Sequence, residues 1–310
     1  MQKILVTGAL GQIGVELIDA LRKTYGKNHV IASDLRADAE NAYGPYEQLD
    51  VLDTQKLTEV IKEHKITRIY HLAALLSAVG EHHPLKAWDV NMTGTLNVYE
   101  AARHHGVESV FVPSSIGAFG ASTPLDQTPQ DTIQRPSTMY GITKVAGELL
   151  GDYYANKFGL DCRGLRFPGL ISYLAPPGGG TTDYAVEIFH YAVKGQPYTC
   201  YLRPDTSLDM MYMPDALQAC IQLMEAPADQ LIHRNAFNVT AMQFTPEQLT
   251  AEIQKHVPDF TINYEVDPIR QSIADSWPNS MDDSAARQEW GWSPEYDLSK
   301  MVAEMLKHLR

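Results

Sequence analysis

The chain has few cysteines, no long apolar run and no leader-like start. Its three cysteines, Cys162, Cys200 and Cys220, are an odd number without Cys-x-x-Cys spacing, which argues against a disulfide framework or a structural zinc site. No stretch approaches the roughly 18 consecutive apolar residues of a membrane span. The first residues enter an apolar strand pattern at Ile4 instead of a charged-then-apolar leader. We therefore expect a reduced, cytoplasmic protein.

Basic residues are also scarce. The 310 residues hold 25 Lys and Arg against 38 Asp and Glu, a net charge of −13. Such a surface repels a nucleic-acid backbone or an anionic membrane, so we expect neither as a partner. Hydrophobic residues at 44% and charged residues at 20% are ordinary values for a globular protein. The length suits one large domain, or one domain with a smaller cap.

What the chain does contain is an alternation of short β-branched runs and amphipathic helical segments. Strands are expected at 4–7, 30–33, 68–72, 109–113 and 161–167, and helices at 12–23, 55–64, 85–104 and 138–157. This alternation predicts an α/β fold with a doubly wound, Rossmann-like parallel sheet. A Pro- and Gly-rich stretch at 175–182 then interrupts the pattern. We expect a first domain over 1–167, with segments near 205–230 rejoining it, and a smaller α/β substrate cap over most of 168–310.

A glycine-rich turn follows the first expected strand. Residues 7–14 read Thr-Gly-Ala-Leu-Gly-Gln-Ile-Gly, with Gly8, Gly11 and Gly14 placed for a tight turn and Gln12 and Ile13 opening a helix. Such a loop lets the backbone and a helix N-terminus approach a pyrophosphate. A plain strand-to-helix turn is the alternative interpretation. In this context the turn predicts that the first domain binds a dinucleotide.

Asp34 and Leu35 end the second expected strand. Asp34 lies 34 − 14 = 20 residues after the last glycine, the spacing of a carboxylate that binds the adenosine ribose hydroxyls. A carboxylate at this place repels a 2′-phosphate, which favours NAD over NADP as the cofactor. Arg36 is also placed to pair with such a phosphate, and a solvated turn is the other interpretation of Asp34.

Tyr140 and Lys144 form a Tyr-x-x-x-Lys pair on one face of an expected helix. A free phenol has a pKa near 10, and a neighbouring ammonium lowers it toward that of a general base. The motif recurs at Tyr153 and Tyr296, so the spacing alone does not select Tyr140. Ser115, at the carboxyl end of the fourth strand, selects it by supplying a hydroxyl beside that helix. Ser114 is an alternative to Ser115 as the hydroxyl that contacts the substrate. The alternative role of Ser115 is to cap the end of the strand.

The glycine-rich turn, the paired serines and Tyr-x-x-x-Lys occur together with His71-Leu-Ala-Ala74 after the third strand and with Asn91. In these motifs the chain resembles the extended short-chain dehydrogenase/reductases over its first 170 residues. The resemblance resumes at Trp290-Gly-Trp-Ser-Pro294. It implies that Lys144 binds the nicotinamide ribose and that Asn91 holds a proton-relay water. It also implies a homodimer through the helices at 85–104 and 138–157. The further cofactor contacts that it implies are Asp50, Val51, Leu72, Ala73, Ala74 and Phe167.

The chain departs from the nucleotide-sugar members of that family at two anchors. Pro168 and Gly169 stand where an Asn-x-Tyr-Gly-Pro stretch would begin, and Leu208 replaces an arginine that holds the diphosphate. Residues 176–185 and 75–78 are instead similar to the L-threonine 3-dehydrogenase branch, although the glycine-rich part also suits a flexible linker. This likeness implies that the substrate contacts are Ser77, Thr181, Thr182, Asp183 and, closing over the amino acid, Trp277.

The resemblance thus implies an NAD-dependent oxidation of L-threonine at its 3-hydroxyl to L-2-amino-3-oxobutanoate. Tyr140 would be the general base, assisted by Lys144, and Ser115 would orient the reacting oxygen. A sugar-nucleotide epimerase or dehydratase and a dinucleotide-sensing regulator without catalysis are the alternatives. No metal is expected, because His82-His83 and His104-His105 lack partners at ligand spacing.

Overall fold

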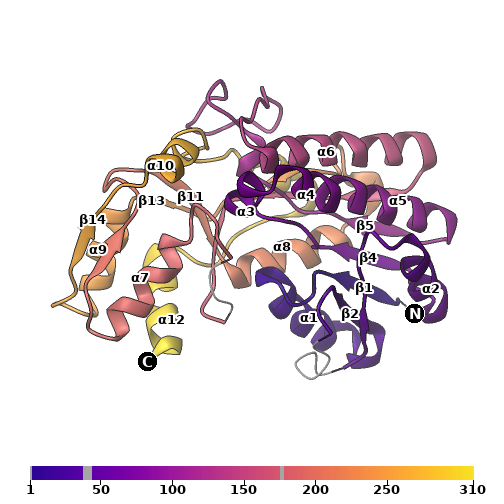
Figure 1. Cartoon of the computed structure of the whole chain (residues 1–310), viewed down its shortest axis with the longest axis horizontal. Coiled ribbons are helices and arrows are strands. Elements are labelled where there is room, and N and C mark those ends of the chain that lie inside the picture. The colour runs from indigo at the N-terminus through magenta and orange to yellow at the C-terminus, as the bar shows by residue number, and fades with distance from the viewer. Residues whose placement is uncertain (1, 38–43, 175–177) are drawn as a thin grey trace.

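The computed structural model describes residues 2–37, 44–174 and 178–310. Figure 1 shows a layered lobe around a parallel sheet, with a second lobe beside it. The second lobe holds the helices α7 (Tyr184–Val193), α9 (Pro246–Gln254), α10 (Pro268–Ala274) and α12 (Leu298–Leu309). In the part of the chain that the structure describes, no helix is both long and apolar enough to cross a membrane.

The main sheet has six strands, all parallel, in the order β3-β2-β1-β4-β5-β7. They are β3 (Tyr46–Gln48), β2 (Val30–Asp34), β1 (Ile4–Thr7), β4 (Arg68–His71), β5 (Ser109–Phe111) and β7 (Asp161–Arg163). The chain builds outward from β1 to one edge and then from β4 to the other. The strand order therefore reverses between β1 and β4, where such sheets bind ligands. The predicted doubly wound parallel sheet is confirmed.

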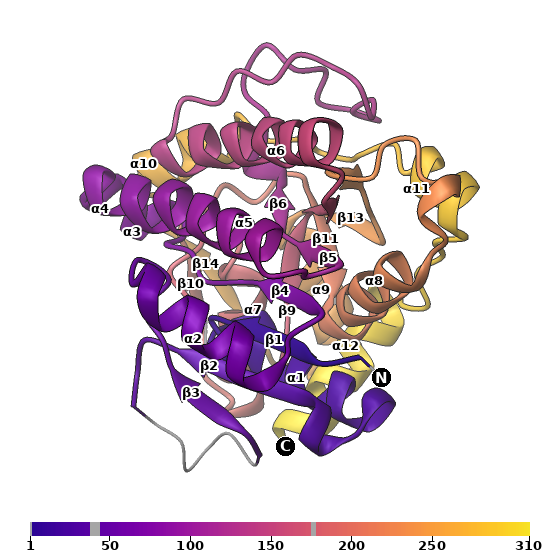
Figure 2. The same cartoon turned by 90° about the vertical axis from the view of Figure 1, so that its right-hand side faces the viewer.

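Both faces of this sheet are buried under helices. In β1, Ile4 and Val6 pack on one side and Leu5 on the other, because successive side chains of a strand point to opposite faces. The first side is covered by α1 (Gln12–Tyr25) and α8 (Met213–Glu225), and the second by α2 (Thr54–His64), α5 (Gly94–His104) and α6 (Met139–Phe158). In Figure 2, α5 and α6 run side by side over that second face.

The sequence-based strand at 161–167 is wrong as a single element. The chain breaks at Gly164, where an added Cβ would lie 2.5 Å from the carbonyl oxygen of Val112. Beyond the break, β8 (Leu165–Phe167) joins a small parallel sheet with β6 (Ser114–Ser115) and β12 (Phe237–Asn238). This second sheet places Ser114 and Ser115 past the end of β5, at the edge where the site lies.

The expected helix at 85–104 is also divided. It consists of α4 (Pro84–Trp88), a π-helical turn over Asp89–Thr93, and α5. The wider turn carries Asn91, and such turns are frequent at functional sites. Three shorter helices are not indicated by the sequence pattern. They are α3 (Ser77–His82), α10 (Pro268–Ala274) and α11 (Ser284–Trp290).

The second lobe has its own apolar core, in which Tyr184, Phe189, Leu249 and Met305 are buried together. Its helices include α7 (Tyr184–Val193), α9 (Pro246–Gln254) and α12 (Leu298–Leu309), and its strands are β9 (Gly169–Ile171), β10 (Tyr198–Cys200), β11 (Leu208–Tyr212), β13 (Met242–Phe244) and β14 (Ile262–Tyr264). The domain boundary at residue 167 stays a prediction.

Asp209 is a fully buried carboxyl group within β11. Its two oxygens accept hydrogen bonds from Thr240 Oγ1 at 2.6 Å and from the backbone N–H of Met281 at 2.8 Å. Burial raises the pKa of Asp209 to about 8, against the opposing effect of these hydrogen bonds. The folded protein therefore holds a proton here that the unfolded chain has already lost at neutral pH.

Asp209→Asn is expected to remove one source of pH-dependent stability. Between about pH 4 and pH 8 the unfolded carboxyl is ionised and the folded one is not, so the free energy of unfolding of the native protein should fall, relative to the variant, by about 1.4 kcal/mol per pH unit. Urea unfolding of both proteins from pH 5 to pH 8 measures this difference. Parallel stability curves would contradict the assignment.

Candidate active site

A cavity lies at the carboxyl edge of the main sheet, between the glycine-rich loop, the start of α6 and the second lobe. Most of the residues singled out from the sequence line it. These are Gly8, Gly11, Gln12, Ile13, Gly14, Leu72, Ala74, Ser77, Ser115, Tyr140, Lys144, Phe167, Thr181, Thr182, Asp183 and Trp277. The fold thus gathers segments far apart in the sequence around one space.

Each of the three positions in the loop has a different structural reason for being glycine. Gly8 has a φ of +67°, and a Cβ there would lie 2.6 Å from the backbone nitrogen of Ala73. A Cβ at Gly14 would lie 2.4 Å from the carbonyl oxygen of Gly8. At Gly11 the nearest atom would be 3.2 Å away, and the residue lines the cavity. Gly8 and Gly14 allow close packing of the protein, whereas Gly11 leaves room for a bound group.

The loop also offers hydrogen-bond donors that are not used within the protein. Helix α1 starts after Gly11 without a side-chain cap and without an acidic residue in its first turn. Among the described residues, nothing accepts a hydrogen bond from the buried Nε2 of Gln12. Free amides and the positive end of the helix dipole favour an anion. This donor set fits the pyrophosphate of a nicotinamide dinucleotide.

Asp34 lies at the rim of this loop. Its Oδ2 accepts from the Leu10 N–H at 3.0 Å, and its Oδ1 accepts from Arg36 Nε at 3.2 Å. Arg36 also donates to the carbonyl oxygen of Leu10 at 2.5 Å, so the guanidinium is folded back onto the loop. The cavity lining does not include six of the residues expected at the cofactor, which are Asp34, Leu35, Asp50, Val51, Ala73 and Asn91.

One face of α6 carries Tyr140 and Lys144 against the segment after β5. Thr138 caps the helix, accepting from the Gly141 N–H at 3.0 Å. Lys144 Nζ donates to the carbonyl oxygen of Pro113 at 2.7 Å and lies 5.3 Å from the centre of the Tyr140 ring. The Ser115 hydroxyl interacts with the Tyr140 phenol and acts to lower its pKa. The three groups therefore lie together at the cavity wall, with Tyr140 buried and Ser115 and Lys144 partly exposed.

The two adjacent serines have different partners. Both serines line the cavity. Ser115 Oγ accepts from the Gly117 N–H at 3.1 Å and interacts with the Tyr140 phenol. Ser114 Oγ instead donates to the buried carboxylate of Glu148. The geometry favours Ser115 as the hydroxyl that meets a substrate.

Burial shifts both titratable groups of the cluster. It raises the pKa of Tyr140, against the opposing hydrogen bond with Ser115. It lowers the pKa of Lys144 to about 8, and the nearby carboxylate of Glu148 acts in the other direction. In the protein alone, desolvation thus outweighs the stabilisation of a Tyr140 phenolate.

The other two Tyr-x-x-x-Lys pairs lie outside the cavity lining. Tyr153 is half exposed and packs against Tyr154 and Phe158. Tyr296 packs edge-on against Tyr212, with ring centres 4.8 Å apart.

A second, smaller cavity adjoins the first behind Lys144, and it is lined by Ala73 and Asn91 among others. Asn91 Oδ1 accepts from the Leu75 N–H at 2.8 Å, and its Nδ2 donates to Thr143 Oγ1 at 3.1 Å. This amide fixes the segment after β4 to α6. His71 lines the same cavity, and burial together with the charge of Lys144 lowers its pKa to about 3, which keeps the ring neutral.

The substrate side of the main cavity is polar but contains little free charge. Ser77 begins α3 and is buried, and Trp277 is buried on the opposite side. Thr181 is 1% exposed, and its hydroxyl has no hydrogen-bond partner within the described chain. Asp183 Oδ2 accepts from the N–H groups of Gly179 and Gly180, both at 2.7 Å. Residues 175–177 of the expected substrate segment lie outside the described residues.

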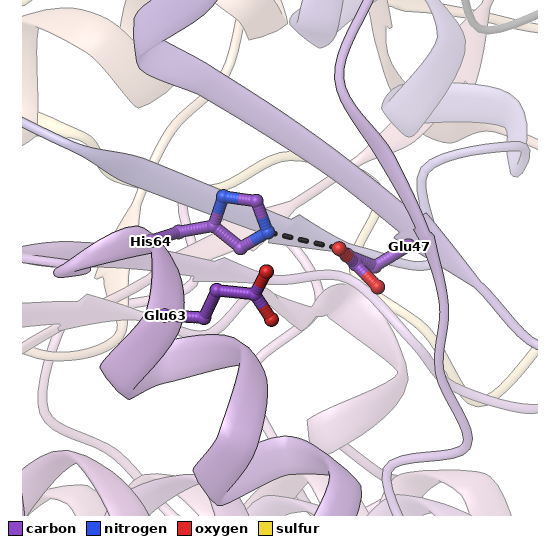
Figure 3. A group of neighbouring side chains, drawn as sticks. All are labelled: Glu47, Glu63 and His64. Carbon is purple, nitrogen blue, oxygen red and sulfur yellow. Dashed lines mark hydrogen bonds and ion pairs between the residues drawn. The ribbon is translucent and has the colours of Figure 1, made fainter.

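The described residues hold one group that could ligate a metal, and it lies away from the cavity. Glu47 on β3 and Glu63 and His64 at the end of α2 bring their ligand atoms within 4.8 Å of one another. Figure 3 shows His64 hydrogen-bonded to Glu47. Lys56 Nζ also lies 3.1 Å from Glu47, so this carboxylate already has two basic partners. Its contacts are those of a surface ion-pair cluster.

Comparison with known proteins places this geometry in a family. The model of the NAD dependent epimerase/dehydratase family matches residues 4–240. An uncharacterized epimerase/dehydratase from Staphylococcus haemolyticus is 54% identical to this chain. The alignment covers 99% of this chain and 97% of the relative.

Solved structures of similar proteins cover the whole fold. L-threonine dehydrogenase from Clostridium difficile is 57% identical, with a TM-score of 0.97 over 100% of this chain and 98% of that one. GalE-like L-threonine dehydrogenase from Cupriavidus necator, in its holo form, is 54% identical, with a TM-score of 0.98 over 99% and 100%. A monomeric L-threonine 3-dehydrogenase from a metagenome is 48% identical, with a TM-score of 0.96 over 99% and 98%.

With a family model over most of its length and a relative more than half identical along nearly all of it, the chain belongs to the NAD dependent epimerase/dehydratase family.

Proposed function

We propose that the protein is an NAD-dependent dehydrogenase that oxidises the 3-hydroxyl of L-threonine to L-2-amino-3-oxobutanoate. One observation carries the proposal. A single cavity joins the Ser115, Tyr140 and Lys144 cluster to a small polar wall, and no arginine stands among its described lining residues. Such a wall suits a small zwitterion better than a nucleotide diphosphate. The similar structures named as L-threonine dehydrogenases support the same substrate.

Tyr140 accepts the proton of the substrate hydroxyl, and Ser115 orients the oxygen from which it leaves. The Ser115 hydroxyl already interacts with Tyr140, so the pair is arranged before a substrate enters. NAD, when bound, would supply the acceptor for the hydride from C3 and a positively charged ring that favours the phenolate form of Tyr140. Lys144, held by the Pro113 carbonyl, adds an ammonium beside the Tyr140 ring.

The substrate side of the cavity provides groups for the two charged ends of an amino acid. A carboxylate needs donors and an ammonium needs acceptors. The unpartnered hydroxyl of Thr181 and the hydroxyl of Ser77 line the cavity, and Asp183 brings a carboxylate to the same wall. We assign the amino-acid contacts to these residues, with Thr182 and Trp277 completing the wall.

Leu208 makes the sugar-nucleotide alternative less suitable. It is fully buried in β11 and pairs with Phe244 of β13, so this position offers no group to a diphosphate. The sensing alternative would not require a serine and a lysine that both lie beside a buried tyrosine.

We also propose a homodimer through the outer face of α4, α5 and α6, which lie side by side (Figure 2). Large apolar side chains are exposed along these helices: Leu85, Trp88, Leu96, Ile142, Leu149 and Tyr153. Exposed apolar area of this extent marks a protein–protein contact.

Tyr140→Phe is expected to lower kcat by about 100-fold to 10,000-fold, because it removes the proton acceptor and little else. NAD binding should change less than about threefold, since the ring remains in place. Absorbance of the reduced nicotinamide with NAD and L-threonine measures turnover, and calorimetry measures binding. Near-normal turnover would refute the role of Tyr140. UDP-glucose and UDP-galactose, offered in parallel, test the sugar-nucleotide alternative.

Asp34→Asn is expected to narrow the preference for NAD over NADP by about tenfold, because a charged acceptor for the ribose hydroxyls is replaced and its repulsion of a 2′-phosphate is lost. The ratio of kcat/KM for the two cofactors is the measurement. An unchanged ratio would show that Asp34 does not select the cofactor.

Leu149→Arg is expected to dissociate the dimer, because it places a charge in the centre of the apolar face. Sedimentation velocity should show two chains for the native protein and one for the variant. Ile232→Arg is the matched control, because Ile232 is an exposed apolar residue outside that face. A native protein that sediments as one chain, like the monomeric relative, would contradict the proposal.

A further inference from the structure

Glu148 is a buried carboxylate that the proposed mechanism leaves without a role. It lies one turn beyond Lys144 on α6, and only about 6% of it is exposed. Its Oε1 accepts from Ser114 Oγ and from Arg166 Nε, the latter at 3.0 Å. Its Oε2 accepts from Arg166 NH2 at 2.9 Å and from Gln134 Nε2 at 2.7 Å. The three partner residues come from different segments, so the carboxylate ties α6 to β6 and β8.

Arg166 fixes this pair to the small second sheet. It is buried, lies opposite Ser114 in the pairing of β6 with β8, and donates to Gln130 O at 2.7 Å and to Asn238 Oδ1 at 3.1 Å. A buried ion pair in which each side-chain nitrogen and oxygen has a hydrogen-bond partner has little freedom to move. Ser114 is therefore held by a rigid group.

Three successive residues after β5 contact three successive turns of α6. Pro113 accepts from Lys144, Ser114 donates to Glu148, and the Ser115 hydroxyl interacts with the Tyr140 phenol. Because these residues are covalent neighbours, a shift at Ser114 moves the groups on both sides. Small displacements of reacting groups reduce rates strongly.

Glu148 and Lys144, one turn apart on α6, both line the second cavity. The other charged or titratable groups around this pair are Arg166 on β8, Asp152 on the same helix, Tyr140, and His71 on β4, whose ring is neutral. Among them, Glu148 is the group that opposes the loss of a proton from Lys144.

We propose that Glu148 is a positioning residue, which fixes Ser115 through Ser114 and keeps Lys144 in its ammonium form. The inference rests on the proposed function, because it assigns Glu148 a part in that same reaction.

The test compares kcat as a function of pH for the native enzyme, Glu148→Gln and Ser114→Ala, with NAD and L-threonine. Without the carboxylate, Lys144 loses its proton at lower pH, so the alkaline limb of Glu148→Gln should move down by about half a unit to one unit. Its kcat should fall about tenfold to 100-fold, with KM for L-threonine changed less than threefold. Ser114→Ala keeps the charge, so its kcat should fall about tenfold while the alkaline limb stays in place.

Glu225→Gln is the matched control. Glu225 also accepts from an arginine and a hydroxyl, Arg68 and Tyr25, but Arg68 begins β4, at the opposite edge of the sheet. Its profile should equal that of the native enzyme.

A Glu148→Gln enzyme with the native pH profile, or Ser114→Ala with native kcat, would overturn the inference. If Glu148→Gln does not fold by circular dichroism, the result with Ser114→Ala decides. A native protein that does not reduce NAD with L-threonine would overturn the proposed function, and the inference with it.

Discussion

The site depends on one close approach between two backbones. Gly8 lies so near Ala73 that a Cβ on Gly8 would be 2.6 Å from the backbone nitrogen of Ala73. This contact joins the loops after β1 and β4 at the point where the strand order reverses. As a result, the open N-terminus of α1 lies on the same cavity as Ser115 and Tyr140. Without it, a phosphate-binding loop and a catalytic helix would both exist, but they would not border one space.

Much of the fold could be predicted from local sequence, because buried parallel strands and amphipathic helices have distinct periods. The strands β1, β2 and β4 and the helices α1, α2 and α6 lie where the pattern predicts them. The break at Gly164 was missed, since a run of strand-forming residues does not show where the chain must step aside. The pairing of β12 with β8 joins segments about seventy residues apart, so local periodicity could not show it.

The candidate site was predictable where it follows motifs of fixed spacing, and not where it depends on tertiary contacts. Nothing in the sequence distinguishes Ser114 from Ser115, yet one hydroxyl meets a carboxylate and the other a phenol. Asp183 was expected at the substrate, which stays a prediction, and the structure shows its carboxylate accepting from two loop amides. Glu148 had one signal, its position four residues after Lys144, which becomes meaningful only when the facing segment is known.

The electrostatics of the cluster explain why its charged groups occur in pairs. Burial disfavours a lone phenolate at Tyr140 and a lone ammonium at Lys144. An opposite charge nearby favours both charged forms, and Lys144 Nζ lies 5.3 Å from the centre of the Tyr140 ring. Glu148 with Arg166 forms a second pair of zero net charge behind the first. Two compensated pairs let this part of the protein hold four charges, so loss of a proton from Tyr140 beside Lys144 creates a pair rather than an isolated charge.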